Sequence, residues 1–231
     1  MRPIPMAVML CVLVITGIVA LRPAGYANDK TDRSTMMSEK PDGYPLATLA
    51  GGCFWCLESE FRGRTGIVYT VVGYTGGHID NPTYEQVGTA TTGHAEAVEI
   101  YYDPALTSYH DILEYFLTAA HDPTQTDGQW VDKGPQYRSV IFYHDDVQRQ
   151  EAEEMIATLS AQKYFQKPIA TAIEPARTFW PAEEYHQQYY EKYEERTGQE
   201  HIRVYLKEQN KQNRKDRKST RLTPVTVRSR M

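Results

Sequence analysis

The amino-acid sequence predicts an α+β fold, a two-layer sandwich in which helices cover a sheet. Hydrophobic residues make up 41% of the 231-residue chain and charged residues 24%, which is ordinary for soluble globular proteins and excludes collagen-like and wholly disordered chains. Between residues 44 and 206, segments with the two-residue period of strands alternate with segments that have a helical period. No repeat or linker interrupts this range, so we expect one domain.

The first four elements follow from local patterns. Two leucines before a pair of glycines predict a short strand over residues 46–49 that enters a tight turn, and a helix follows over 53–62 until glycines end it. Residues 67–74 are rich in Val and Tyr and predict a second strand. Apolar residues alternate with Glu and Tyr over 98–102, which predicts a half-buried third strand.

The later elements complete the predicted domain. Ser108, with Asp111 three residues on, predicts a capping box that opens a helix extending to Ala120. After a polar loop over 121–134 we expect a strand over 137–143, a helix over 147–162, a strand over 169–173 and a Tyr-rich helix over 181–196. The first six elements have the order βαββαβ, which is the split βαβ, ferredoxin-like pattern.

The N-terminal segment is predicted to direct export. Over residues 1–27, Arg2 precedes an uncharged run at Met6–Leu21, and the small residues Gly25 and Ala27 suit a signal peptidase. We therefore expect a periplasmic or cell-envelope location. The alternative is a membrane anchor formed by an uncleaved signal, although the run is shorter than the roughly 20 residues that span hydrocarbon.

Two polar segments flank the predicted domain. Residues 28–43 have few apolar side chains and are expected to form a flexible leader. Residues 207–231 carry nine Lys and Arg against two acidic residues, so we expect a disordered basic tail. A weak contact with anionic lipid or with a partner surface is the alternative role for this tail.

Charge and cysteine count narrow the function. The net charge of −5 and the pI of about 5.8 give no electrostatic case for nucleic-acid binding. Three cysteines cannot build a disulfide framework. Because Cys11 lies in the predicted signal, the mature chain keeps only Cys53 and Cys56.

Both remaining cysteines lie in the segment Gly51-Gly52-Cys53-Phe54-Trp55-Cys56-Leu57-Glu58. Cys53 falls at a helix start, where N–H groups and the helix dipole favour a thiolate, so we expect a lowered pKa and a nucleophilic sulfur. Cys56 lies one helical turn further on, within disulfide reach. The segment therefore predicts a redox-active pair.

Other interpretations of this pair compete. A structural zinc site needs four ligands, and the histidines at 78, 94, 121 and 186 lie at no zinc-motif spacing. A structural disulfide that closes so small a loop removes little entropy from the unfolded chain. A CxxC motif is also typical of thioredoxin-like oxidoreductases, but there it follows a βα unit rather than the first strand. A binding module that uses the pair structurally would leave Cys53 inert to alkylation at neutral pH.

Carboxyl and phenol groups elsewhere could complete a site. By strand alternation Glu96 shares a face with Val98 and Ile100. If that face points inward, Glu96 is a buried carboxyl with a raised pKa that can donate a proton at pH 7; if not, it is a carboxylate on the rim. Asp132 and Tyr137 have the same two interpretations.

Five blocks, in order along the chain, resemble the A-type peptide methionine sulfoxide reductases. They are Gly-Cys-Phe-Trp-Cys with Glu58, Gly73-Tyr74-Thr75-Gly76-Gly77, Asn81-Pro82-Thr83-Tyr84, Gly93-His94-Ala95-Glu96-Ala97 and Gln136-Tyr137-Arg138-Ser139. The resemblance covers residues 46–193. It implies an enzyme that reduces methionine (S)-sulfoxide, free or in proteins, and so repairs oxidised proteins.

The resemblance also implies the roles of single residues. Cys53 attacks the sulfoxide sulfur and is left as a sulfenic acid. Glu96 is the protonated acid that delivers a proton to the sulfoxide oxygen, while Tyr84 and Tyr137 hydrogen-bond that oxygen. Asp132 helps to organise the pocket.

The resemblance also implies which residues bind the substrate and how the enzyme is recycled. The resemblance implies that Phe54 and Trp55 receive the substrate methyl group and that His186 and Tyr189 lie near this pocket. It implies neither a metal nor an organic cofactor, and a thioredoxin-like protein as electron donor. Many relatives have glycine in place of Cys56 and carry recycling cysteines in a C-terminal tail. The tail of this chain has none, so we expect either Cys56 or an external thiol to resolve the sulfenic acid.

Overall fold

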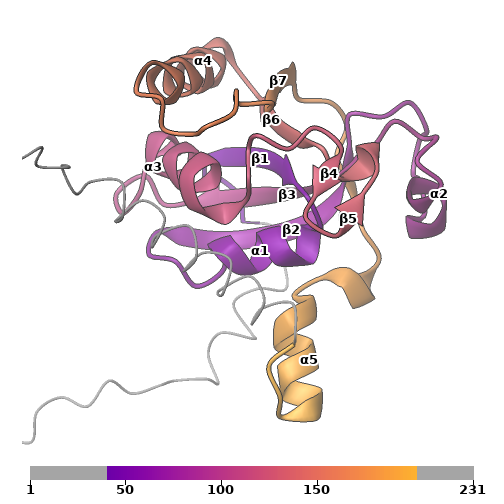
Figure 1. The fold of residues 1–231 in the computed structure, drawn as a ribbon. Coiled ribbons are helices and arrows are strands. Elements are labelled where there is room, and N and C mark those ends of the chain that lie inside the picture. Colours follow the sequence, from indigo (N-terminus) through magenta and orange to yellow (C-terminus); the bar gives the residue numbers. More distant parts are fainter. Residues whose placement is uncertain (1–40, 202–231) are drawn as a thin grey trace, which may run out of the picture. The chain divides into compact units, whose positions relative to one another are not determined.

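The computed structural model describes residues 41–201 (Figure 1). The predicted signal peptide at 1–27, nearly all of the leader at 28–43 and the basic tail at 207–231 lie outside the described residues, and so does the end of the predicted domain after residue 201. Export and a lipid contact of the tail therefore stay predictions. Within the described range, no helix has the length and hydropathy needed to cross a membrane.

A six-stranded sheet forms the centre of the domain, in the order β7-β6-β1-β3-β2-β8. Strands β6 and β7 pair in parallel, and the other neighbouring pairs are antiparallel. Because β1 and β2 both pair antiparallel with β3, they run parallel to each other with β3 between them. The strands are β1 (Leu46–Gly51), β2 (Ile67–Thr75), β3 (Ala95–Tyr102), β6 (Ser139–Tyr143), β7 (Ala172–Pro175) and β8 (Trp180–Pro181).

Helices cover one face of this sheet and bury the main core. Alternate residues of β1 and β3, such as Leu49, Val98 and Ile100, pack against them and are fully buried. On the opposite face smaller side chains such as Ala50 and Ala97 form a second core cluster. The α+β class is confirmed. The covering helices are α1 (Phe54–Phe61), α3 (Tyr109–Tyr115) and α4 (Asp146–Ala161) (Figure 1).

Several elements differ from the sequence prediction in the first part of the chain. The turn-rich stretch after β2 contains a five-residue helix, α2 (Tyr84–Gly88), whose start is fixed by a capping box between Thr83 and Gln86. The Ser108–Asp111 capping box is present as predicted. The α-helix that it begins, α3, ends at Tyr115, and a π-helical turn follows over Phe116–Ala120.

The polar loop and the strand after it also differ. The loop holds a short hairpin of β4 (Gly128–Gln129) and β5 (Asp132–Lys133). Tyr137 closes a 3-10 turn at Pro135–Tyr137, so the strand expected from 137 begins only at Ser139. Tyr137 is thereby placed on the turn that leads into β6 rather than in the sheet.

The predicted helix over residues 181–196 is wrong as a single element. Its range contains the end of β8, a 3-10 turn at Glu184–His186 and α5 (Tyr189–Thr197). The break comes at Gln187, whose buried side chain accepts from the backbone N–H of Val72 at 3.0 Å and donates to the carbonyl of Val72 at 2.9 Å. Gln188 then takes a left-handed conformation with φ of 49°. Local pattern could not reveal this break, because its cause is a contact with β2.

Candidate active site

Two glycines bring Cys53 to the start of α1 at the end of β1. Gly52 has a φ of +97°, and a Cβ atom there would lie 2.7 Å from the Cβ of Gln129, so this turn requires glycine. Cys53 is the N-cap of α1, makes no capping hydrogen bond and is 7% exposed. The turn therefore places a sulfur at the junction of strand and helix, below the surface.

Glu96 faces this junction from β3. Its side chain is 2% exposed, and its Oε2 accepts a hydrogen bond of 2.9 Å from the backbone N–H of Phe54, the first residue of α1. The inward interpretation from strand alternation is therefore correct, and the rim interpretation is wrong. The N–H of Phe54, the residue directly after Cys53, is thus directed at this carboxyl group, and Glu96 and Cys53 line the same cleft.

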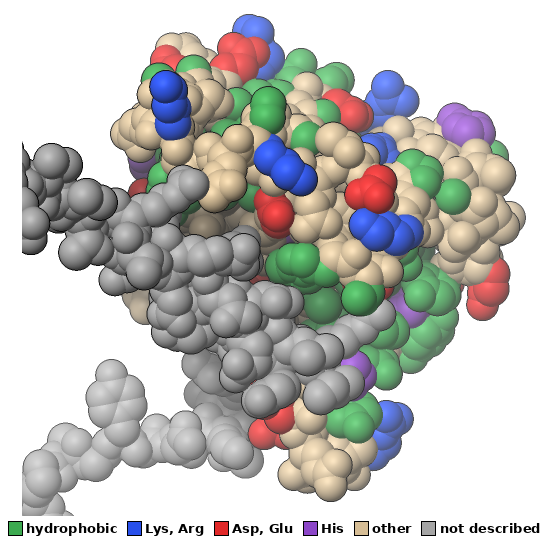
Figure 2. All heavy atoms as spheres, in the orientation of Figure 1, with side chains coloured by type: hydrophobic (Ala, Val, Ile, Leu, Met, Phe, Trp, Pro, Cys, Tyr) green, Lys and Arg blue, Asp and Glu red, His purple; other side chains and the backbone are tan. Residues whose placement is uncertain are grey.

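A small cleft of about 50 Å³ opens over these groups. In the space-filling view, hydrophobic side chains gather on the face between α2 and α5 (Figure 2). Such a volume is above the roughly 10–15 Å³ that a cavity needs to hold a water molecule, so the cleft suits one small functional group of a larger substrate. It is lined by Cys53, Phe54, Trp55, Tyr84, Glu96, Asp132 and Tyr137.

A larger cavity of about 360 Å³ lies at the other end of α1. Its walls include Arg64, Asp111 and Tyr115, and none of the residues that the sequence analysis assigned to a site. The cysteine, the buried carboxyl and the phenols instead converge on the smaller cleft. We therefore place the chemistry there.

The prediction of a lowered pKa for Cys53 is wrong. A hydrogen bond with Cys56 and burial raise the pKa of the Cys53 thiol well above its usual value, and the charge of Glu96 adds to this. The backbone N–H of Cys56 at the helix start lowers the pKa of Cys53, but by less than these effects raise it, and the Phe54 N–H is directed at Glu96 instead. This raised pKa favours the protonated thiol at neutral pH.

The two phenols of the cleft come from short elements that the sequence did not predict. Tyr84 begins α2 and Tyr137 closes the 3-10 turn. Burial raises the pKa of Tyr137, and the nearby Glu96 and Tyr84 raise it further, so its hydroxyl stays protonated at neutral pH and can donate a hydrogen bond. Asp132, on β5, lines the same cleft and contributes to this shift.

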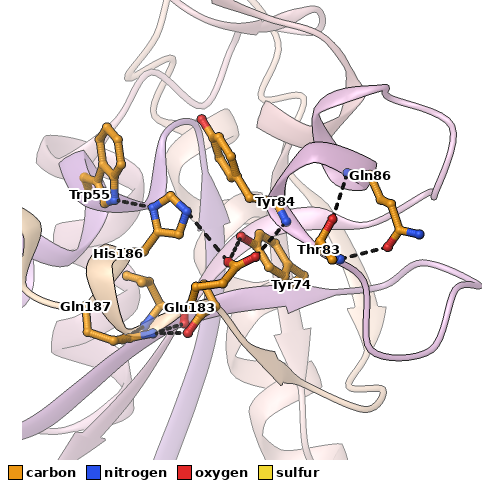
Figure 3. Close-up of polar contacts among 10 residues, drawn as sticks. Trp55, Tyr74, Thr83, Tyr84, Gln86, Glu183, His186 and Gln187 are labelled. Atoms are coloured by element: carbon orange, nitrogen blue, oxygen red, sulfur yellow. Dashed lines mark hydrogen bonds and ion pairs between the residues drawn. The ribbon is translucent and has the colours of Figure 1, made fainter.

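Trp55 is held by a histidine from the far end of the chain (Figure 3). Its Nε1 donates a hydrogen bond of 3.1 Å to Nδ1 of His186, which is 1% exposed. Burial lowers the pKa of His186. A neutral imidazole that accepts at Nδ1 carries its proton on Nε2, and Nε2 lies 3.7 Å from Oε2 of Glu183. The indole is also stacked on Tyr189, with ring centroids 3.8 Å apart and an interplanar angle of 9°.

Glu183 connects this aromatic wall to the phenol Tyr84. Its Oε1 accepts from the Tyr84 backbone N–H at 3.0 Å, and its Oε2 accepts from the Tyr74 hydroxyl at 3.0 Å (Figure 3). Burial opposes ionisation of Glu183, but these hydrogen bonds hold its pKa below the usual value. The sequence analysis missed Glu183. Its only sequence signal is its position three residues before His186.

Cys56 lies on α1 outside the lining of the cleft, and its sulfur contacts α5. The Sγ atom is 3.0 Å from the hydroxyl oxygen of Tyr190, a second residue that the sequence analysis missed. The structure has no disulfide between Cys53 and Cys56. Among residues 41–201 no group of three or more His, Cys, Asp or Glu side chains could hold a metal ion.

The arrangement can bind and reduce a small polar group. A thiol stands beside a buried carboxyl, phenols that can donate lie across from them, and Phe54 and Trp55 supply an apolar wall. Hydrogen-bond donors directed at a developing oxyanion, together with a proton source, are what reduction of an X=O bond by a thiol requires.

Comparisons with known proteins agree with this chemistry. The family "Peptide methionine sulfoxide reductase" matches residues 46–220. The chain is 54% identical over 147 residues to peptide methionine sulfoxide reductase MsrA 2 of Staphylococcus aureus (strain MW2), covering 63% of this chain and 82% of that protein. It is 52% identical over 153 residues to MsrA of Streptococcus equi subsp. equi (strain 4047), covering 66% and 90%.

Solved structures are similar as well. Mxr1 from Saccharomyces cerevisiae in reduced form matches with a TM-score of 0.62 at 34% identity, over 67% of this chain and 88% of that chain. Methionine sulfoxide reductase A of Corynebacterium diphtheriae matches with a TM-score of 0.58 at 34% identity, over 66% and 76%.

Proposed function

This chain belongs to the peptide methionine sulfoxide reductase family, an oxidoreductase family, and we propose that it reduces methionine (S)-sulfoxide, free or in proteins, at Cys53. The observation that carries the proposal is the hydrogen bond of 2.9 Å between Phe54 N–H and Glu96 Oε2. It fixes a buried carboxyl beside the sulfur nucleophile at the bottom of a cleft with apolar and phenolic walls.

The first step transfers one oxygen atom. The sulfoxide oxygen points to Glu96, Tyr84 and Tyr137, and the methyl group lies against Phe54 and Trp55. Glu96 gives a proton to the oxygen, and Cys53 Sγ attacks the sulfur while its own proton passes to the Glu96 carboxylate. The new bond between Sγ and the substrate sulfur then breaks together with the substrate S–O bond, as the hydroxyl passes to Sγ. This leaves a Cys53 sulfenic acid and methionine, so the thiol loses two electrons and the substrate gains them.

The raised pKa of Cys53 fits this sequence of events. A buried thiolate would have no cation among the residues that line the cleft to offset its charge, which is unfavourable. A proton on the substrate oxygen makes the sulfur electrophilic and leaves Glu96 as an acceptor at the same moment. Glu96 therefore acts first as acid and then as base, and the cleft returns to its starting charge.

Recycling uses the second cysteine. Cys56 attacks Sγ of the sulfenic acid, an S–S bond forms, and the hydroxyl leaves as water with the Cys56 proton. A thioredoxin-like dithiol then reduces the Cys53–Cys56 disulfide by exchange. The two sulfurs lie one helical turn apart, so the start of α1 must unwind locally to reach disulfide geometry.

Turnover of the separate epimers tests the proposed function. Methionine (S)-sulfoxide and (R)-sulfoxide, each free and within a peptide, are supplied to the full chain with dithiothreitol as reductant. We expect reduction of both S substrates and of neither R substrate, and no reduction by the Cys53→Ser variant. Equal reduction of both epimers, or no reduction of the S epimer, contradicts the proposal.

We also propose that the protein is exported. The uncharged run at Met6–Leu21 and the small residues Gly25 and Ala27 support this. Fractionation of the native host followed by sequencing of the mature N-terminus should place the protein in the cell envelope with a start near Asn28. A full-length product in the cytoplasm contradicts export and leaves the enzymatic proposal untouched.

A further inference from the structure

Cys56 is held from outside the cleft by the second residue of α5. Its Sγ lies 3.0 Å from the hydroxyl oxygen of Tyr190, within hydrogen-bond distance for a sulfur atom. Tyr190 itself is 6% exposed, so this hydroxyl is directed inward at α1 rather than at solvent. The reduction of the substrate, as described above, makes no use of this contact.

Two further contacts fix the position of Tyr190. On one side of it in sequence, the backbone N–H of Gln188 donates to the buried carboxyl of Glu58 at 2.9 Å. On the other side, Glu191 accepts from Nε of Arg62 at 2.7 Å. Both partners lie on or directly after α1, so the tyrosine is anchored to the same element that carries Cys56.

We propose that Tyr190 donates a hydrogen bond to the Cys56 sulfur and thereby speeds its attack on the Cys53 sulfenic acid. The inference rests on the proposed function, because it needs the sulfenic acid that substrate reduction leaves. As Cys56 attacks, the S–S bond forms, the Cys53 S–O bond breaks, and the Cys56 proton leaves with the hydroxyl as water. Tyr190 keeps its proton and stabilises the negative charge that develops on the attacking sulfur.

The structure assigns the recycling step a donor that the first step does not share. Tyr190 is absent from the lining of the cleft, whereas Tyr84 and Tyr137 belong to it. Loss of the Tyr190 hydroxyl should therefore slow disulfide formation and leave the release of the first methionine at its normal rate.

Single-turnover measurements on Tyr190→Phe test this. Enzyme is mixed with less than one equivalent of methionine (S)-sulfoxide without reductant, and samples are quenched over time. Methionine is quantified, and mass spectrometry follows the sulfenic acid and the Cys53–Cys56 disulfide. Hydrogen bonds to charged groups are stronger than those between neutral groups, so we expect disulfide formation to slow roughly tenfold or more. Tyr193→Phe, a tyrosine of the same helix without a contact to Cys56 Sγ, is the matched control and should behave as wild type.

A second variant tests the anchoring of α5. Arg62→Gln removes the ion pair with Glu191 but keeps the Tyr190 hydroxyl, and we expect a smaller slowing of disulfide formation. Unchanged disulfide formation in Tyr190→Phe overturns the inference, and faster formation means that Tyr190 restrains Cys56 instead of activating it. If wild-type enzyme releases no methionine at all, it is the proposed function that fails.

Discussion

Glu183 and Tyr84, 99 residues apart in the chain, are joined by a hydrogen bond of 3.0 Å between Oε1 of the carboxylate and the backbone N–H at the start of α2. The second oxygen of Glu183 faces the Tyr74 hydroxyl and, at 3.7 Å, Nε2 of His186. One carboxylate therefore fixes the start of α2, which carries a phenol of the cleft, and lies close to the histidine that accepts from the indole of Trp55.

This geometry predicts that Glu183 is a positioning residue. Glu183→Ala removes the acceptor of the Tyr84 N–H and of the Tyr74 hydroxyl and lets the start of α2, with the Tyr84 phenol, shift. Because small displacements of reacting groups are costly, we expect kcat/KM with methionine (S)-sulfoxide and dithiothreitol to fall roughly 10- to 100-fold, with Glu183→Gln affected less. Steady-state kinetics measure this. The neighbouring Glu184→Ala, at a side chain 87% exposed, should change little; an equal loss in both variants argues for general destabilisation.

Glu96 should be required for the chemical step. Glu96→Gln can still accept from the Phe54 N–H but cannot supply a proton, so release of methionine in a single turnover should slow by roughly 10²–10⁴-fold. The matched control is Glu99→Gln, a buried carboxyl on the same strand whose partner is the Tyr101 hydroxyl on the opposite face. An unchanged rate in Glu96→Gln would return Glu96 to a purely structural role.

Substitutions of the two cysteines should affect different steps of the catalytic cycle. Cys53→Ser should abolish activity. Cys56→Ser should release about one methionine per enzyme, because the first step uses only Cys53 and the cleft residues. It should then stall with a thioredoxin-like donor and continue with dithiothreitol, which reduces a sulfenic acid directly. Normal turnover of Cys56→Ser with the protein donor means that the donor reduces Cys53 directly.

Glu58 should make the folded state less stable as the pH rises. Burial raises its pKa from 4.5 to about 7, despite the opposing charge of Arg62. Between these two values the folded state binds the proton more tightly than the unfolded chain, so the free energy of unfolding falls with pH. At 1.36 kcal/mol per pKa unit the loss is on the order of 3 kcal/mol.

Urea denaturation at pH 4.5 and pH 8 measures this loss. Glu58→Gln does not titrate, so the difference between wild type and variant cancels the contribution of other groups. The wild type should lose more stability than the variant on going to pH 8. Equal losses would place the pKa of Glu58 near that of an exposed carboxyl.

The local sequence pattern was sufficient to predict the structure of segments whose conformation depends only on neighbouring residues. The alternation over Glu96, Val98 and Ile100 indicated which face of β3 is buried, because side chains of a strand point alternately to its two faces. The capping box between Ser108 and Asp111 and the tight turn at the two glycines before Cys53 were also predicted from the sequence. These features need no partner distant in sequence.

What only the tertiary structure decided depends on groups brought together from distant positions. The predicted last helix is broken at Gln187 because the side chain of this residue forms hydrogen bonds with the backbone of Val72 on β2. The Cys53 thiol keeps its proton because the Cys56 side chain, burial and the Glu96 carboxyl together outweigh the helix start. The sequence by itself singled out every residue that lines the cleft. Packing decided their protonation and their supports, Glu183 and Tyr190, because charge stabilisation and hydrogen bonding depend on distances in space.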